Sequence, residues 1–148
     1  MKDIAALLAK FSNAHGLSGY EDDVASLLRD EMEPLVDEVR VDKMGNVIAT
    51  RSGKGPVVMV AAHMDEIGLM VSHIDDDGYL RIVPVGGWSD QTILGQRVMV
   101  HTRDGKRIPG AVGSRPPHLM DVEERKRLIK IKDMFVDCGA TNAANAAE

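Results

Sequence analysis

The stretch Val57–Gly68 reads VVMVAAHMDEIG and passes from an uncharged apolar run directly into a His-x-Asp pair. Its first six residues, Val57–Ala62, are apolar without polar alternation, which predicts a strand buried on both faces of a parallel sheet. Ligands bind outside the carboxyl ends of strands in open α/β sheets, so His63 and Asp65 stand where a functional site is expected. Because side chains alternate along extended chain, both should point to the same side.

An imidazole beside a carboxylate has a specific use at metal sites. Neutral histidine is a common ligand for divalent transition metals, and a carboxylate that holds its second nitrogen fixes the tautomer and raises the basicity of the ring. A hydrolytic zinc site needs about three protein ligands. This segment supplies one, His63, with Asp65 to orient it. A purely structural hydrogen bond explains the same pair, so the residues alone leave both interpretations open.

No other motif completes such a site. The remaining histidines lack metal-ligand spacing and are interpreted as surface or hydrogen-bonded residues: His15, His73, His101 and His118. The run Asp75–Gly78 resembles the start of a calcium loop but lacks the later bidentate glutamate, and a hairpin turn explains it better. Neither a phosphate-binding glycine loop nor a Ser-His-Asp triad can be assembled from the motifs in this chain.

Composition restricts the class of protein. The 148 residues are 44% apolar, which suits one ordinary domain or two small ones, and the formal net charge is -5. Basic and acidic residues are interspersed, so nucleic acid and anionic membranes are not expected partners, and a peptide or small molecule fits better. The single cysteine, Cys138, fits a reducing cytosol and a buried apolar role. We therefore expect a cytoplasmic protein.

The N-terminal part of the chain is expected to contain helices followed by strands. Apolar residues at i, i+3, i+4 and i+7 predict a helix from Ile4 to about His15. Ser18 and Glu21 have the spacing of a capping box and predict the start of a second helix, which Pro34 ends. Two strands are expected at 36–41 and 47–50, ahead of the strand at 57–62.

After Gly68 the pattern changes to short strands with glycine turns. Asp77-Gly78 and Asp104-Gly105 each divide two apolar segments, as in tight hairpins, and this half is predicted to form a small β-barrel. A further strand is expected at 134–136, a helix begins near Thr141, and 123–127 is expected to be a short exposed helix or a loop. The domain boundary is expected between Glu66 and Leu69, giving domains 1–67 and 68–148.

Six blocks in a fixed order resemble one family of enzymes. They lie between Gly16 and Ala140 and read GLSGYED, AAHMDEIGLMV, VGGW, LGQRV, GAVGSRPPHLM and KDMFVDCGA. The chain resembles the cytosolic di-metal aminopeptidases, which include glutamyl and TET-type aminopeptidases and some members labelled endoglucanase.

The resemblance implies a fold and a chemistry. The fold would be the N-terminal part of a zinc-exopeptidase α/β domain, a mixed sheet with helices, interrupted by a small β-barrel that acts as lid and dimerisation domain. His63 would be a metal ligand and Asp65 the catalytic carboxylate that orients the site. Two divalent ions, zinc or cobalt, would activate the water that hydrolyses the N-terminal peptide bond. A homo-oligomer formed through the barrel and a peptide substrate would follow.

The resemblance covers only the first part of such enzymes. Their bridging aspartate, general-base glutamate, further acidic ligand and second histidine have no counterpart here, and Glu148 comes too early to be any of them. We expect an N-terminal fragment that ends as the barrel closes, holds at most one weak metal site and is inactive alone. Two other functions remain open: a non-catalytic dimerisation or interaction module derived from such a peptidase, and, ranked last, a glycan hydrolase.

Overall fold

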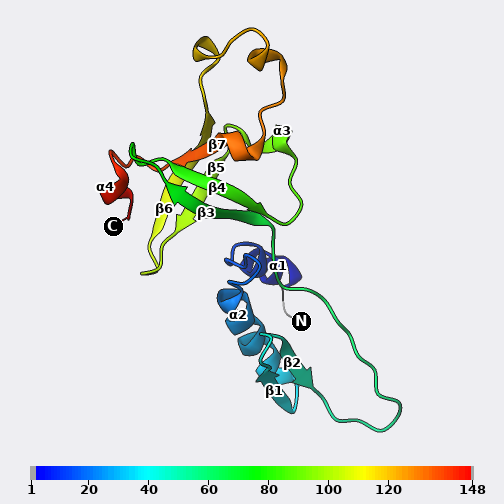
Figure 1. The fold of residues 1–148 in the computed structure, drawn as a ribbon. Helices are drawn as coiled ribbons and strands as arrows, with labels where there is room; N and C mark the ends of the chain where they lie inside the picture. The colour runs from blue at the N-terminus through cyan, green and yellow to red at the C-terminus, as the bar shows by residue number, and fades with distance from the viewer. Residues whose placement is uncertain (1–2, 148) are drawn as a thin grey trace. The chain divides into compact units, whose positions relative to one another are not determined.

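The computed structural model describes residues 3–147 and divides into two compact units, Met1–Glu66 and Ile67–Glu148. The domain boundary expected from the sequence lay one residue later. The function of each unit remains a prediction. Figure 1 shows the helices and strands of both units.

The first unit opens with two helices, α1 (Ile4–Ser12) and α2 (Asp22–Met32). Asp3 caps α1, because its Oδ1 accepts hydrogen bonds from the backbone N–H groups of Ala5 and Ala6 at 3.0 and 3.4 Å. The capping box predicted at Ser18 is wrong. The helix begins only at Asp22, and Glu21 Oε1 accepts instead from the Gly19 N–H at 2.7 Å. The positive φ of Gly19 bends the chain before α2, which moves the helix start beyond Ser18.

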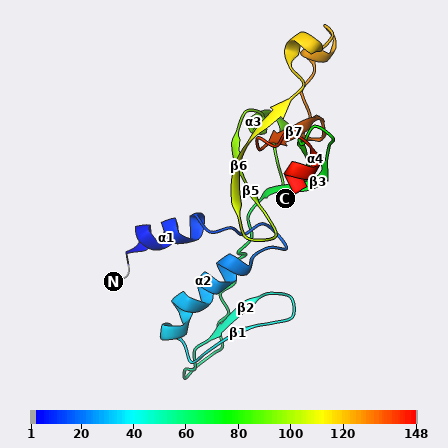
Figure 2. The same ribbon diagram turned by 90° about the vertical axis from the view of Figure 1, so that its left-hand side faces the viewer.

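An antiparallel hairpin follows α2 after a short 3-10 turn, η1 (Glu33–Leu35). Its strands are β1 (Glu38–Val41) and β2 (Val47–Thr50), which pair in register from Glu38–Thr50 to Val41–Val47. In the turn between them, Asp42 accepts backbone hydrogen bonds from Met44 and Asn46 at 2.9 and 3.0 Å. Both strands were predicted. Figure 2 shows the hairpin below α2, and α2 contacts both strands.

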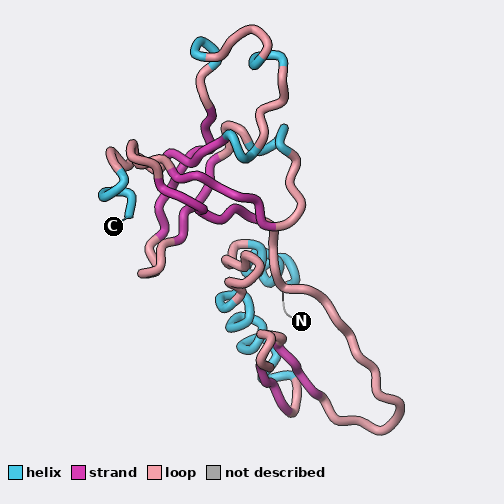
Figure 3. The backbone as a smooth tube through the Cα atoms, in the orientation of Figure 1, coloured by secondary structure: helices cyan, strands magenta, loops and turns pink. Residues whose placement is uncertain are grey.

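The strand predicted at Val57–Ala62 is absent, which corrects the central expectation from the sequence. This segment forms part of a long loop without helix or strand (Figure 3). The side chains of Val57–Val60 are between 79% and 99% exposed. A central strand needs main-chain partners on both sides, but β1 and β2 form a sheet with each other only. The apolar pattern of Val57–Ala62 suits a strand between two partner strands, and residues 3–147 provide no partner strand for this segment.

The second unit is a curled antiparallel sheet with the order β3-β4-β7-β6-β5. Its strands are β3 (Gly68–Ile74), β4 (Leu80–Val85), β5 (Arg97–His101), β6 (Arg107–Ser114) and β7 (Met134–Asp137). The two hairpins predicted from Asp77-Gly78 and Asp104-Gly105 are confirmed, as is the last strand. The predicted β-barrel does not close over the described residues, because β3 and β5 remain edges of the sheet.

Short helices and turns complete this unit. α3 (Asp90–Ile93) precedes β5, and α4 (Ala143–Ala147) follows β7. Three 3-10 turns lie in the loop from β6 to β7: η2 (Pro117–Leu119), η3 (Glu124–Lys126) and η4 (Ile131–Asp133). The predicted exposed element at 123–127 is the turn η3. Figure 2 shows this loop extending away from the sheet before the chain returns to β7.

Asp90 fixes the end of that loop to the body of the unit. Its Oδ1 accepts from the Ile131 N–H at 2.8 Å, and its Oδ2 accepts from the Lys130 ammonium at 3.0 Å. The hydrogen bond from the Ile131 backbone, helped by that from Lys130, lowers the pKa of Asp90 below its ordinary value of 3.8. The clamp therefore strengthens above about pH 4 and weakens as the pH falls through the lowered pKa.

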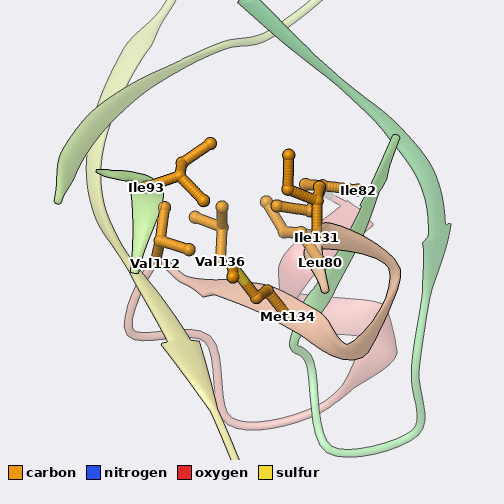
Figure 4. Packing of buried hydrophobic residues seen from close by; sticks show 7 residues of the cluster. All are labelled: Leu80, Ile82, Ile93, Val112, Ile131, Met134 and Val136. Atoms are coloured by element: carbon orange, nitrogen blue, oxygen red, sulfur yellow. The ribbon is translucent and has the colours of Figure 1, made fainter. Parts of the chain in front are cut away.

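The hydrophobic core of the second unit lies inside the curl of the sheet (Figure 4). Leu80, Val136 and Val112 form one row across β4, β7 and β6, and each is 3% exposed. The other buried members are Ile82, Ile93, Ile131 and Met134. Cys138 packs half-buried against this core, consistent with its predicted apolar role.

We expect Met134→Ala to destabilise the second unit by about 2–5 kcal/mol, because Met134 is 1% exposed and its truncation leaves a cavity. Urea denaturation followed by circular dichroism measures this change. The matched control is Met99→Ala, at a methionine that is 51% exposed, and it should cost less than about 0.5 kcal/mol. Equal losses for the two variants would contradict the assigned core.

We also expect the exposed segment Val57–Val60 to drive self-association, because an uncharged, β-branched run without pairing partners is prone to aggregate. The double variant Val58→Lys/Val60→Lys should raise the monomer fraction in sedimentation velocity. Val122→Lys, at another exposed valine, serves as the control. Wild-type protein that sediments as a monomer at all concentrations would contradict this expectation.

Candidate functional site

His63 and Asp65 contact each other, as their spacing predicted. His63 Nδ1 lies 3.0 Å from Asp65 Oδ1 and 3.1 Å from the Asp65 carbonyl oxygen. This contact leaves Nε2 as the ring atom that can bind a ligand. The pair is close to solvent, since the side chains of His63 and Asp65 are 86% and 40% exposed. The segment that carries both residues is loop, without the preceding strand that the sequence predicted.

Two hydrogen bonds, one of them between main-chain groups, attach Glu66, the residue after this pair, to the loop between α1 and α2. The Glu66 N–H donates to the Gly16 carbonyl oxygen at 2.7 Å, and the Gly16 N–H donates to Glu66 Oε1 at 3.2 Å. Leu17 and Glu66 form an isolated parallel bridge. The His-x-Asp segment is thus held at its C-terminal side by a contact fifty positions away in the sequence.

Gly16 permits this close approach because it has no side chain. A Cβ atom at position 16 would lie 2.7 Å from Cγ2 of Val24 and 3.3 Å from the Met64 carbonyl oxygen. Val24 and Leu17 are buried, so little room exists for adjustment. The roles of Gly16 and Glu66 were missed from the sequence, where Gly16 marked a helix end and Glu66 a domain boundary. A single sequence contains no periodic signal for such a long-range contact.

The other candidate ligands do not join this pair. Within residues 3–147 no group of three or more His, Cys, Asp or Glu side chains is arranged to hold a metal ion. His63 and Asp65 suit one corner of a metal site, an imidazole ligand with an orienting carboxylate, and they do not build a whole site. The Asp75–Gly78 run is a hairpin turn, in which Asp75 accepts from the Tyr79 N–H at 2.9 Å and pairs with Arg81 at 2.8 Å.

Among residues 3–147, no helix is long and apolar enough to cross a membrane.

Comparison with known proteins identifies the family. The chain belongs to the M42 glutamyl aminopeptidases, whose family model matches residues 45–148. It is 45% identical over 144 residues to the lysyl aminopeptidase of Pyrococcus furiosus, covering 96% of this chain and 41% of that protein. The chain therefore spans about two fifths of the length of this relative.

Solved structures agree with the assignment. The TET aminopeptidase of a marine sediment archaeon, Thaumarchaeota archaeon SCGC AB-539-E09, superimposes with a TM-score of 0.91 at 41% identity, covering 96% of this chain and 40% of that one. The TET1 peptidase of Pyrococcus horikoshii gives 0.85 at 35% identity, covering 97% and 43%. That peptidase can assemble into a tetrahedron or a large octahedral shell. The fold of this chain is thus that of the N-terminal part of a TET-type aminopeptidase.

We expect the chain to retain well under one equivalent of zinc after dialysis, because the pair supplies only one of about three ligands needed. Elemental analysis measures the retained metal. Added zinc should still shift the His63 ring signals in NMR spectra, and His63→Ala should abolish this response while His118→Ala leaves it unchanged. Near-stoichiometric zinc that survives dialysis would contradict the expectation.

Proposed function

We propose that this chain carries the N-terminal part of a metal-dependent aminopeptidase and that it contributes His63 as a metal ligand. The observation that supports the proposal is the 3.0 Å contact from His63 Nδ1 to Asp65 Oδ1, which leaves Nε2 available. Asp65 then holds the ring in one tautomer and orientation, the role of a carboxylate behind a ligating histidine. Family membership supports the reaction class, hydrolysis of the N-terminal peptide bond.

The metal supplies an activated water and stabilises developing charge when it is bound. This chain contributes to that chemistry by orientation. The hydrogen bonds between Gly16 and Glu66 hold the main chain beside Asp65, and Asp65 holds the ring of His63. We propose two zinc or cobalt ions in the complete site and no peptide hydrolysis by this chain alone.

Assembly and cellular location are part of the same proposal. Relatives such as the TET1 peptidase form large homo-oligomers, which supports a homo-oligomer here as well. We assign the oligomerisation and lid role to the second unit, whose curled sheet replaces the expected barrel. The single cysteine fits a cytoplasmic location.

A chimaeric enzyme tests the assignment. Residues 1–148 replace the matching N-terminal part of the Pyrococcus furiosus lysyl aminopeptidase, with which they share 45% identity. The chimaera should release the chromogenic amine from lysyl anilide when zinc or cobalt is present, whereas the chain alone should not. Asp65→Asn should reduce kcat/KM by about 10–100-fold, and His63→Ala should reduce it at least as much.

The control is His118→Ala, which lies in the turn η2 and should keep full activity. An active chimaera that tolerates His63→Ala would remove the ligand assignment. Two alternatives predict other results. An interaction module derived from such a peptidase predicts a folded, inactive chimaera whose second unit still self-associates. A glycan hydrolase predicts release of reducing sugar from a soluble cellulose derivative.

A further inference from the structure

The outer edge of β5 presents the main-chain N–H and C=O groups of Arg97 and Met99, for which residues 3–147 provide no second partner strand. The β5–β6 ladder continues beyond both strand ends, since the Val112 N–H donates to Gln96 at 2.9 Å and the Thr102 N–H donates to Lys106 at 3.1 Å. Antiparallel pairs alternate between bonded and non-bonded positions, so Val98 and Val100 direct their N–H and C=O groups toward β6. Arg97 and Met99 therefore direct theirs outward, where no strand of residues 3–147 pairs with β5.

The exposed side chains along this edge are apolar and basic. Val98 and Val100 pack against the core, while Arg97 and Met99 are exposed on the outer face. Met99 pairs with Pro109 across the ladder, so the middle of this face is apolar. The segment 97–107 contains four basic residues and one acid, a net charge of +3 in a chain of net charge -5. They are Arg97, Arg103, Lys106 and Arg107, with Asp104 paired to Lys106 at 2.9 Å.

The two edge strands of the sheet, β3 and β5, differ in how readily another strand can pair with them. In β3 the register shifts between Val71 and His73, and such a bulge disfavours the addition of another strand. β5 pairs without interruption from Arg97 to His101. The β5–β6 hairpin carries this positive charge, with Arg97 on β5 itself, so pairing with the same hairpin of a second copy would bring like charges together. The same charge favours an anionic strand.

We propose that the outer edge of β5 binds an extended acidic peptide segment by β-strand addition. Main-chain hydrogen bonds to Arg97 and Met99 supply affinity, and carboxylates of the peptide lie near Arg97 and Arg107 at the two ends of the Met99–Pro109 surface. The interaction goes beyond the proposed peptidase activity and does not depend on it.

Fluorescence anisotropy tests this binding with a labelled peptide of about seven residues, Val-Thr-Val flanked by glutamates. We expect saturable binding at about 50 mM NaCl that weakens clearly at about 300 mM, and at least about tenfold weaker binding of the lysine-flanked counterpart. Arg97→Glu/Arg107→Glu should weaken binding about tenfold. Arg125→Glu/Arg127→Glu, the same charge change in the loop before β7, should have little effect.

A proline variant separates strand addition from simple charge attraction. Met99→Pro removes the outward N–H without removing a ladder bond to β6, and it should weaken binding about fivefold, whereas Met99→Val should not. Hydrogen exchange of the wild-type chain gives a readout that needs no variant. Peptide binding should slow exchange of the Arg97 and Met99 amides, while the Val98 and Val100 amides stay protected throughout.

Three outcomes of the peptide experiments would overturn the proposal. They are absence of saturable binding of the acidic peptide, equal binding of the acidic and lysine-flanked peptides, and unchanged exchange at Arg97 and Met99 on saturation. Tighter binding of a single-stranded oligonucleotide than of the acidic peptide would also overturn it, because the edge would then be a general polyanion site.

Discussion

The second unit depends on one structural constraint, the insertion of β7 between two hairpins. β3–β4 and β5–β6 are each local in sequence, and only Met134–Asp137 hydrogen-bonds to both. Its Val136 completes the core row with Leu80 and Val112, while Phe135 faces the other side. There Phe135 lies under the Arg81 guanidinium, 5.5 Å from the ring centroid. Gly113 leaves space for this ring, because a Cβ at that position would lie 2.8 Å from it.

In the first unit, two contacts hold the candidate site, one between residues close in the sequence and one between residues far apart in it. The His63–Asp65 contact spans two positions and involves only neighbouring residues of the chain. The Gly16–Glu66 contact spans fifty positions and requires the turn between the helices to be folded. The first contact is therefore present without the expected strand, and the second attaches the chain after Asp65 to the loop between α1 and α2. Within residues 3–147 the pair has no further His, Cys, Asp or Glu beside it to make a group of three ligands.

Much of the fold was predictable because its signals are local. Helical periodicity gave α1 and α2, and the Asp-Gly turns gave both hairpins of the second unit. Failures came where the outcome depends on distant partners. The run Val57–Ala62 has the composition of a central strand, but strand formation requires neighbours that periodicity cannot supply. The predicted barrel does not close for the same reason, because closure requires pairing of β3 with β5, and the pattern within each strand does not specify that partner. At the site, the His63–Asp65 contact was predicted from the two-residue spacing, although the strand assumed in that prediction is absent, whereas Gly16 and Glu66 had no pattern to identify them.

The position of Trp88 decides which unit tryptophan fluorescence can monitor. It is the only tryptophan in the chain, its Nε1–H donates to the Gly68 carbonyl oxygen at 2.8 Å, and its ring packs against the core of the second unit. Tryptophan emission therefore reports the packing of the second unit, in which Trp88 lies. The candidate site lies in the first unit, so the geometry around His63 needs a probe of its own besides this optical signal.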